Sequence, residues 1–184
     1  TPFSYPTLGY FLGAFSICTG MVKPLTVALV LPSRCVILYA TVLGAVSPSL
    51  LGDRYFGTIA AIGATSMPFI LKYQLVGWIR SLGFLFLIVT VYQGLRFYRD
   101  EVKQAGIWTA FFFGLTLLTH PVHALFAGLT VLSQYLAFDR TIRGFGNGVG
   151  IGFGGILVAS PWLVVTILRH GFDPFFSAVQ THGG

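Results

Sequence analysis

The chain has 184 residues, of which 55% are hydrophobic and only 9% are charged. Soluble proteins carry about 25% charged residues, so this composition excludes a soluble globular domain and indicates an integral membrane protein. One bilayer crossing needs about 20 mostly apolar helical residues, so the length allows about six crossings and no soluble catalytic domain. The net charge of +6 comes from Lys and Arg residues scattered at the ends of apolar runs, which excludes a clustered nucleic-acid face.

The N-terminal half of the chain predicts one short helix and two crossings. Leu8–Met21 is apolar but short and interrupted by glycine, which is typical of an interfacial or re-entrant helix on the outer membrane face. Leu25–Val46 is long enough for a full crossing, with a kink expected at Pro32. Phe56–Leu71 predicts the next crossing, which Pro68 is expected to bend or end.

The C-terminal half predicts the remaining crossings. Trp78–Leu95 is one, and it ends in a polar stretch. Ile107–Leu118 is too short alone, so its helix is expected to begin within that polar stretch. After a break at residues 119–121, Val122–Phe138 crosses back. Val149–Leu168 predicts the last crossing, after a glycine-rich start whose small residues permit close helix approach.

These elements predict an all-α fold, a polytopic transmembrane bundle of about six transmembrane helices plus one short interfacial helix. We expect a single transmembrane domain over residues 1–184, with an outer-face segment at 1–23, the bundle at 24–168 and an outer-face tail at 169–184. The loops on one side hold the cations Arg54, Arg96, Arg99, Lys103, Arg140 and Arg143. Those on the other side hold Lys23, Lys72, Arg80 and Arg169. The positive-inside rule places the richer set in the cytoplasm.

Several polar residues gather on the predicted outer side: Lys72, Tyr73, Arg80, His120, His123, Arg169, His170 and Asp173. Ionisable residues at a membrane edge are functional candidates by default, and these side chains suit an anionic ligand such as a lipid phosphate. Arg34 is a further candidate because it lies within an apolar crossing, where a charge needs a partner, water or a bound anion. The alternative is that each cation only extends to the lipid headgroups.

Two histidines and one carboxylate are the remaining candidates for chemistry. His120 and His123 flank Pro121, but no nearby carboxylate completes a ligand set, so helix capping or polar lining is favoured and no metal site is expected. Most of the carboxylates fall in the predicted cytoplasmic loops: Asp53, Asp100, Glu101 and Asp139. Only Asp173 is left on the outer face, as a possible contact for a sugar or acceptor.

Four short motifs follow one another along the chain: Pro2–Leu8, Leu51–Arg54, Gly114–Pro121, and Ala159–Trp162 followed by Arg169–Gly171. The four motifs resemble four segments that occur in the same order in one family. These segments are the one after the first outer loop, a cytoplasmic turn, the end of a helix, and a later helix with its outer loop. That family is the GT-C superfamily of membrane glycosyltransferases, which includes the protein O-mannosyltransferases and the aminoarabinose transferase. The last motif looks like that of prokaryotic members.

The resemblance implies transfer of a sugar from a polyprenyl-phosphate-linked donor to an acceptor on the outer face of a prokaryotic plasma membrane, with no cofactor in the chain. By position, His120 falls where family members often hold a Lys or Arg near the lipid phosphate. The family's catalytic acidic residue lies in the first outer loop, upstream of Thr1, so the chain resembles a fragment without the first helix and that loop. Its catalytic residue is unknown, and whether the chain is an enzyme stays open.

A non-catalytic transmembrane subunit that packs in a larger membrane complex is the alternative. The 18 Phe and 8 Tyr residues suit contacts with membrane lipids and with other transmembrane subunits. A transporter is disfavoured because the sequence shows neither inverted repeats nor midplane charges on several helices.

Overall fold

The computed structural model describes residues 14–15, 17–20, 24–67 and 78–172, which form α-helices and short connections. The helices are α2 (Pro24–Leu51), α3 (Arg54–Ser66), α5 (Trp78–Tyr98), α6 (Lys103–Thr119), α7 (Pro121–Phe138) and α8 (Ile142–His170). The predicted all-α fold is confirmed for this part of the chain. Most of the interfacial helix expected at Leu8–Met21 lies outside the described residues.

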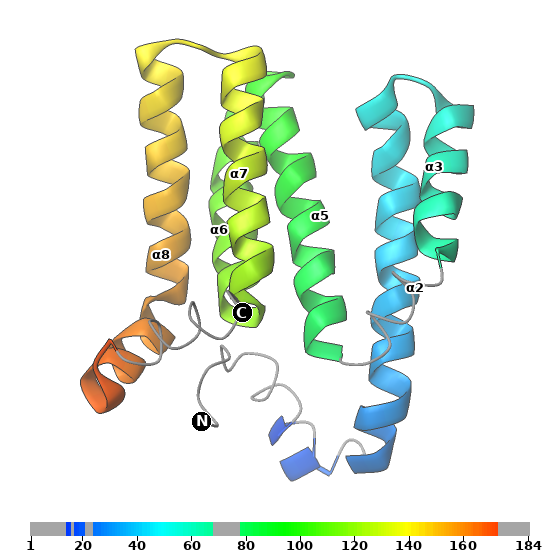
Figure 1. The fold of residues 1–184 in the computed structure, drawn as a ribbon, viewed down its shortest axis with the longest axis vertical. Coiled ribbons are helices and arrows are strands. Elements are labelled where there is room, and N and C mark those ends of the chain that lie inside the picture. The colour runs from blue at the N-terminus through cyan, green and yellow to red at the C-terminus, as the bar shows by residue number, and fades with distance from the viewer. Residues whose placement is uncertain (1–13, 16, 21–23, 68–77, 173–184) are drawn as a thin grey trace, which may run out of the picture.

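The helices run up and down along one axis (Figure 1). Helix α6 packs against α5, α7 and α8, while α2 packs against α5 and carries α3 on its other side. The ends of α2, α5 and α7 lie together, and we call residues 51–54, 96–103 and 138–143 the charged end. The opposite end, formed by residues 78–84, 119–123 and 169–171, is called the histidine end.

Three of the described helices are long and apolar enough to cross a membrane: Arg80–Tyr98 within α5, Pro121–Phe138 and Ile142–His170. About six crossings were predicted, and these three are the ones found among the described residues. Helix α3 has 13 residues, fewer than the about 17–25 of a bilayer crossing, and α6 has 17, at the lower end of that range. Helix α2 has 28 residues, of which the described apolar stretch covers Arg34–Ser49. The chain is thus a helical membrane protein with three candidate spans in its described part.

Large apolar side chains cover the outside of the helices, which supports a lipid environment. Ile107 is 73% exposed, Leu168 is 80% exposed and Ile142 is 93% exposed. Contiguous apolar surface of this kind is unfavourable in water but matches the hydrocarbon interior of a bilayer.

The interior is packed with small and hydroxyl-bearing residues. A Cβ atom on Gly114 would lie 2.7 Å from the Gly155 carbonyl oxygen, so the α6 and α8 backbones touch there. Thr109 and Thr116 are fully buried, and each hydroxyl donates to the carbonyl four residues earlier. The predicted use of small residues for close helix approach is confirmed between α6 and α8.

The last helix is longer than predicted at both ends. Helix α8 begins at Ile142, well before Val149, because the Thr141 hydroxyl accepts a hydrogen bond from the Gly144 N–H at 2.9 Å and caps it. Close packing on α6 offsets the low helix propensity of its glycines. At its other end α8 continues to His170, two residues beyond the predicted end of the last crossing at Leu168.

Other boundaries lie near the predicted ones. Helix α5 extends to Tyr98 instead of Leu95, and α6 begins at Lys103, inside the polar stretch as expected. Helix α3 ends at Ser66, so the effect predicted for Pro68 falls outside the described residues.

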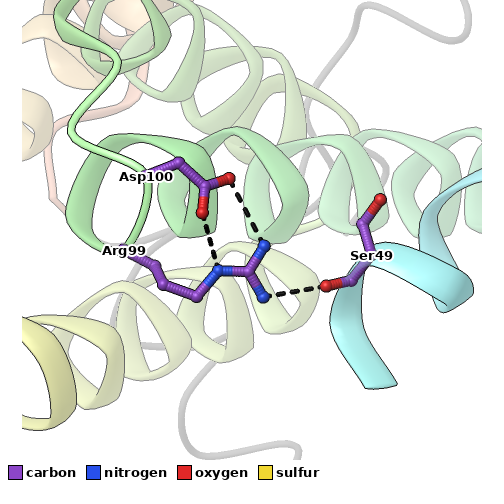
Figure 2. Close-up of polar contacts among 3 residues, drawn as sticks. All are labelled: Ser49, Arg99 and Asp100. Atoms are coloured by element: carbon purple, nitrogen blue, oxygen red, sulfur yellow. Dashed lines mark hydrogen bonds and ion pairs between the residues drawn. The ribbon is translucent and has the colours of Figure 1, made fainter. Parts of the chain in front are cut away.

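An arginine joins α2 to α5 at the charged end (Figure 2). The Arg99 guanidinium donates to the Ser49 carbonyl at 2.8 Å and to the Asp100 carboxylate at 2.7 and 3.3 Å. Ser49 lies in the last turn of α2, whose carbonyls lack partners within the helix. The hydrogen bond to Asp100 raises the pKa of Arg99, and the same bond holds the pKa of Asp100 below its usual value.

The predicted separation of charge is confirmed within the described residues. All six cations assigned to the richer side lie at the charged end: Arg54, Arg96, Arg99, Lys103, Arg140 and Arg143. Four of the five carboxylates lie there as well. The orientation of this end toward the cytoplasm stays a prediction.

Candidate functional site

The candidate site lies at the histidine end, where α5 begins and where α6 passes into α7. His120 is the single non-helical residue between these two helices, with extended backbone angles of φ −155° and ψ 112°. Pro121 cannot donate a backbone hydrogen bond and disfavours helical geometry at the residue before it, so α6 ends and α7 restarts at this point. His123 follows within the first turn of α7 and therefore stays close to His120.

The two imidazoles form a buried stack. Their ring centroids lie 4.3 Å apart with an interplanar angle of 28°. His120 is 4% exposed and His123 is 3% exposed. The Phe84 ring from α5 packs against His123 with centroids also 4.3 Å apart. Burial and the close stacking both disfavour a positive charge on either ring.

A glycine on α5 makes room for this stack. A Cβ atom on Gly83 would lie 2.5 Å from Nδ1 of His123 and 3.2 Å from Cβ of His120. The histidines therefore pack directly on the α5 backbone, one turn from Arg80. The guanidinium of Arg80 is close enough to act electrostatically on His123.

Only part of the predicted set comes together. Arg80, His120 and His123 converge, whereas Arg169 and His170 lie exposed in the last turn of α8, which packs on α6 and α7. These two residues are therefore not part of the described cluster.

Three other predicted positions do not join the cluster. Arg34 lies on α2 with an exposed side chain, so it is not a charge sealed inside the bundle. Lys72 and Asp173 lie outside the described residues, and nothing further is assigned to them.

The cluster is rich in hydrogen-bond donors and contains no carboxylate among the described residues. A guanidinium and two imidazoles supply hydrogen-bond donors that suit phosphate. All carboxylates in the described part of the chain lie at the opposite end of the bundle. Among the described residues, no group of three or more His, Cys, Asp and Glu side chains is placed to hold a metal ion.

Sequence reasoning missed the α5 side of this site. Ser81 is fully buried, and Gly83 and Phe84 contact the histidines. The sequence feature that could have indicated this side is the run Arg80-Ser81-Leu82-Gly83-Phe84 near the start of the helix. In it, Gly83 and Phe84 lie one helical turn after Arg80.

Comparison of the chain with known proteins identified no relative. No family model, no curated protein and no solved structure matches the chain. The likeness to GT-C glycosyltransferases therefore rests on the short motifs of the sequence, and function has to be argued from the site itself.

Proposed function

We propose that the chain is part of a membrane glycosyltransferase that moves a sugar from a polyprenyl-phosphate-linked donor to an acceptor on the outer face. The histidine end binds the donor phosphate. The observation that carries this proposal is the convergence of Arg80 with the buried His120–His123 stack at the membrane edge of α5 and α7. The reaction type is taken from the resemblance of the ordered sequence motifs.

The chemistry of the three side chains fits this role. Arg80 carries a permanent charge that stabilises a phosphate as the sugar leaves it. His120 follows the end of α6 and lies where the family motif places a basic residue near the phosphate. A neutral imidazole of the stack still has one N–H that can donate a hydrogen bond to the phosphate. The group that activates the acceptor is not assigned to a described residue.

Binding of decaprenyl phosphate to the chain in lipid nanodiscs tests the proposal. Arg80→Gln should weaken binding about tenfold or more, because a charge-assisted hydrogen bond is worth about 1.5–3 kcal/mol. Arg96→Gln is the matched control, since Arg96 lies on the same helix at the charged end and should leave binding unchanged. Equal affinity of the Arg80→Gln and wild-type chains, both with native helix content, would overturn the phosphate assignment.

A second candidate, a non-catalytic subunit of a larger membrane complex, is favoured by the outer surface of α3. Tyr55, Phe56 and Ile59 are 84%, 69% and 66% exposed, and α3 is too short to cross a bilayer. Among the described helices, α3 packs mainly on α2. A helix of a partner chain could cover this face.

Purification from native membranes separates the two candidates. A partner protein that copurifies in an amount equal to that of the chain, and that no longer copurifies with the Phe56→Asn variant, would favour the subunit. Donor-dependent sugar transfer by the purified protein, without such a partner, would favour the glycosyltransferase.

A further inference from the structure

A narrow groove runs between α7 and α8, with α6 as its floor. In Figure 1 these two helices stand side by side with α6 behind α7. The groove is lined by apolar side chains and glycines, among them Phe113, Gly128, Val131, Phe145, Gly148 and Gly152. We call this the α7–α8 groove. Its polar groups are the Tyr98 and Tyr135 hydroxyls, which lie toward the charged end.

The size of the groove selects its occupant. Its cavity volume of about 260 Å³ extends over about two helical turns, or about 10 Å, which gives a cross-section of about 26 Å². An α-helix about 10 Å across would need about 80 Å². The groove is therefore wide enough for a single hydrocarbon chain and too narrow to enclose a whole helix.

The groove continues along α7 toward the histidine end. A second, shallower hollow shares Phe113, Gly128 and Leu132 with it and extends to Pro121. The path from Tyr135 to Pro121 covers 14 residues of α7, about 21 Å at 1.5 Å per residue. This exceeds the about 15 Å of one bilayer leaflet and runs parallel to the spanning helices, as a lipid acyl chain does.

A guanidinium lies near the mouth of the groove. Arg140 Nε donates to the Leu136 carbonyl, which keeps the guanidinium one turn beyond the groove residue Leu132. Arg140 makes no ion pair within the described part of the chain. The neighbouring Asp139 carboxylate instead accepts hydrogen bonds from Thr141. An anionic group at the mouth would therefore meet an available guanidinium.

We propose that the α7–α8 groove binds one acyl chain of an anionic membrane phospholipid, whose phosphate contacts Arg140 at the charged end. Apolar lining, single-chain width and a cation at the membrane edge are the three features that such a lipid requires. The proposed phosphate contact lies at the opposite end of the bundle from the histidine cluster, and the proposal does not depend on the proposed sugar transfer.

Filling the groove tests the acyl chain. A Cβ atom on Gly152 meets nothing within 4 Å, so Gly152→Leu projects a side chain into the groove without a backbone clash. Gly150→Leu is the matched control, because a Cβ there also meets open space and Gly150 does not line the groove. Each chain is reconstituted with equal amounts of phosphatidylglycerol and phosphatidylcholine, and retained lipid is counted by native mass spectrometry.

The expected result is one phosphatidylglycerol on the wild-type and Gly150→Leu chains and at least a tenfold loss on Gly152→Leu. If Gly152→Leu loses helix content, Gly128→Leu fills the groove from the α7 wall, where a Cβ would contact only the Phe113 ring at 3.7 Å or beyond. Retention of the lipid by a folded groove-filling variant would overturn the proposal.

Neutralising the mouth tests the headgroup. Arg140→Gln should abolish the preference for phosphatidylglycerol over phosphatidylcholine while one lipid still binds, and Arg140→Lys should keep the preference. An unchanged preference in Arg140→Gln would show that Arg140 does not recognise the negative net charge of the headgroup and would overturn the assignment.

Discussion

The two ends of the bundle use polar residues in different ways. At the charged end, acidic side chains lie in exposed turns and stabilise helix termini: Asp53 caps α3, and Asp139 holds the Thr141 hydroxyl that caps α8. At the histidine end, His120 and His123 are buried and packed on Gly83. Charged residues near solvent therefore each contribute little to the free energy of unfolding. Buried polar groups are expected to contribute more, and at a membrane edge they are the better candidates for binding a ligand.

The largest effect is expected for Gly83→Ala at the histidine end. The added Cβ would lie 2.5 Å from Nδ1 of His123, and such overpacking costs about 1–3 kcal/mol. Unfolding in increasing SDS, followed by circular dichroism, measures the change. Gly63→Ala on α3 is the control, since its Cβ meets nothing within 4 Å and should stabilise the helix by about 0.5–1 kcal/mol. Equal effects of the two substitutions would contradict the packing of the histidines on α5.

A smaller effect is expected for Asp53→Ala at the charged end. The Asp53 carboxylate accepts hydrogen bonds from the Tyr55 and Phe56 N–H groups at 2.7 and 3.0 Å, and loss of such a cap costs about 1 kcal/mol. Asp53→Asn keeps an oxygen acceptor and should retain most of the stability. A loss in Asp53→Asn as large as in Asp53→Ala would show that the charge, and not the cap, matters.

The smallest effect is expected for Arg99→Gln. The Arg99–Asp100 pair and the hydrogen bond from Arg99 to the Ser49 carbonyl are both exposed, so their loss together should cost at most about 1 kcal/mol. Because Arg99 lowers the pKa of Asp100 in the fold, the pair stabilises the protein above the unfolded pKa of about 4, and this stability is lost as the pH falls through the folded value. Arg99→Gln should remove that acid-side dependence in unfolding curves. An identical pH dependence in both proteins would argue against the pair.

The apolar runs and turn residues of the sequence were enough to predict the helices. The break at Pro121 follows from proline chemistry, and the start of α6 at Lys103 follows from the length that a helix needs. The glycine-rich start of α8 could not be predicted as helix, because its stability comes from contacts with α6 that are distant in sequence. Apolar content also does not specify helix length, since α3, predicted as a crossing, ends after 13 residues at Ser66.

The site was predictable in its chemistry but not in its geometry. His120 and His123 are near in sequence, so their proximity follows from one turn of helix. Their packing on Gly83 depends on how α5 meets α7, which no local pattern specifies. The α7–α8 groove was not predicted either, because a groove exists only where side chains are missing between two helices whose relative placement is a tertiary property.

The bond between Arg99 and the Ser49 carbonyl spans 50 residues and has a consequence for biosynthesis. At a translation rate of about 5–20 residues per second, the end of α2 waits about 3–10 s before Arg99 is made. During that interval the last turn of α2 must be satisfied by water or lipid headgroups. The carbonyl of Ser49 therefore gains its protein partner only after α5 has been synthesised.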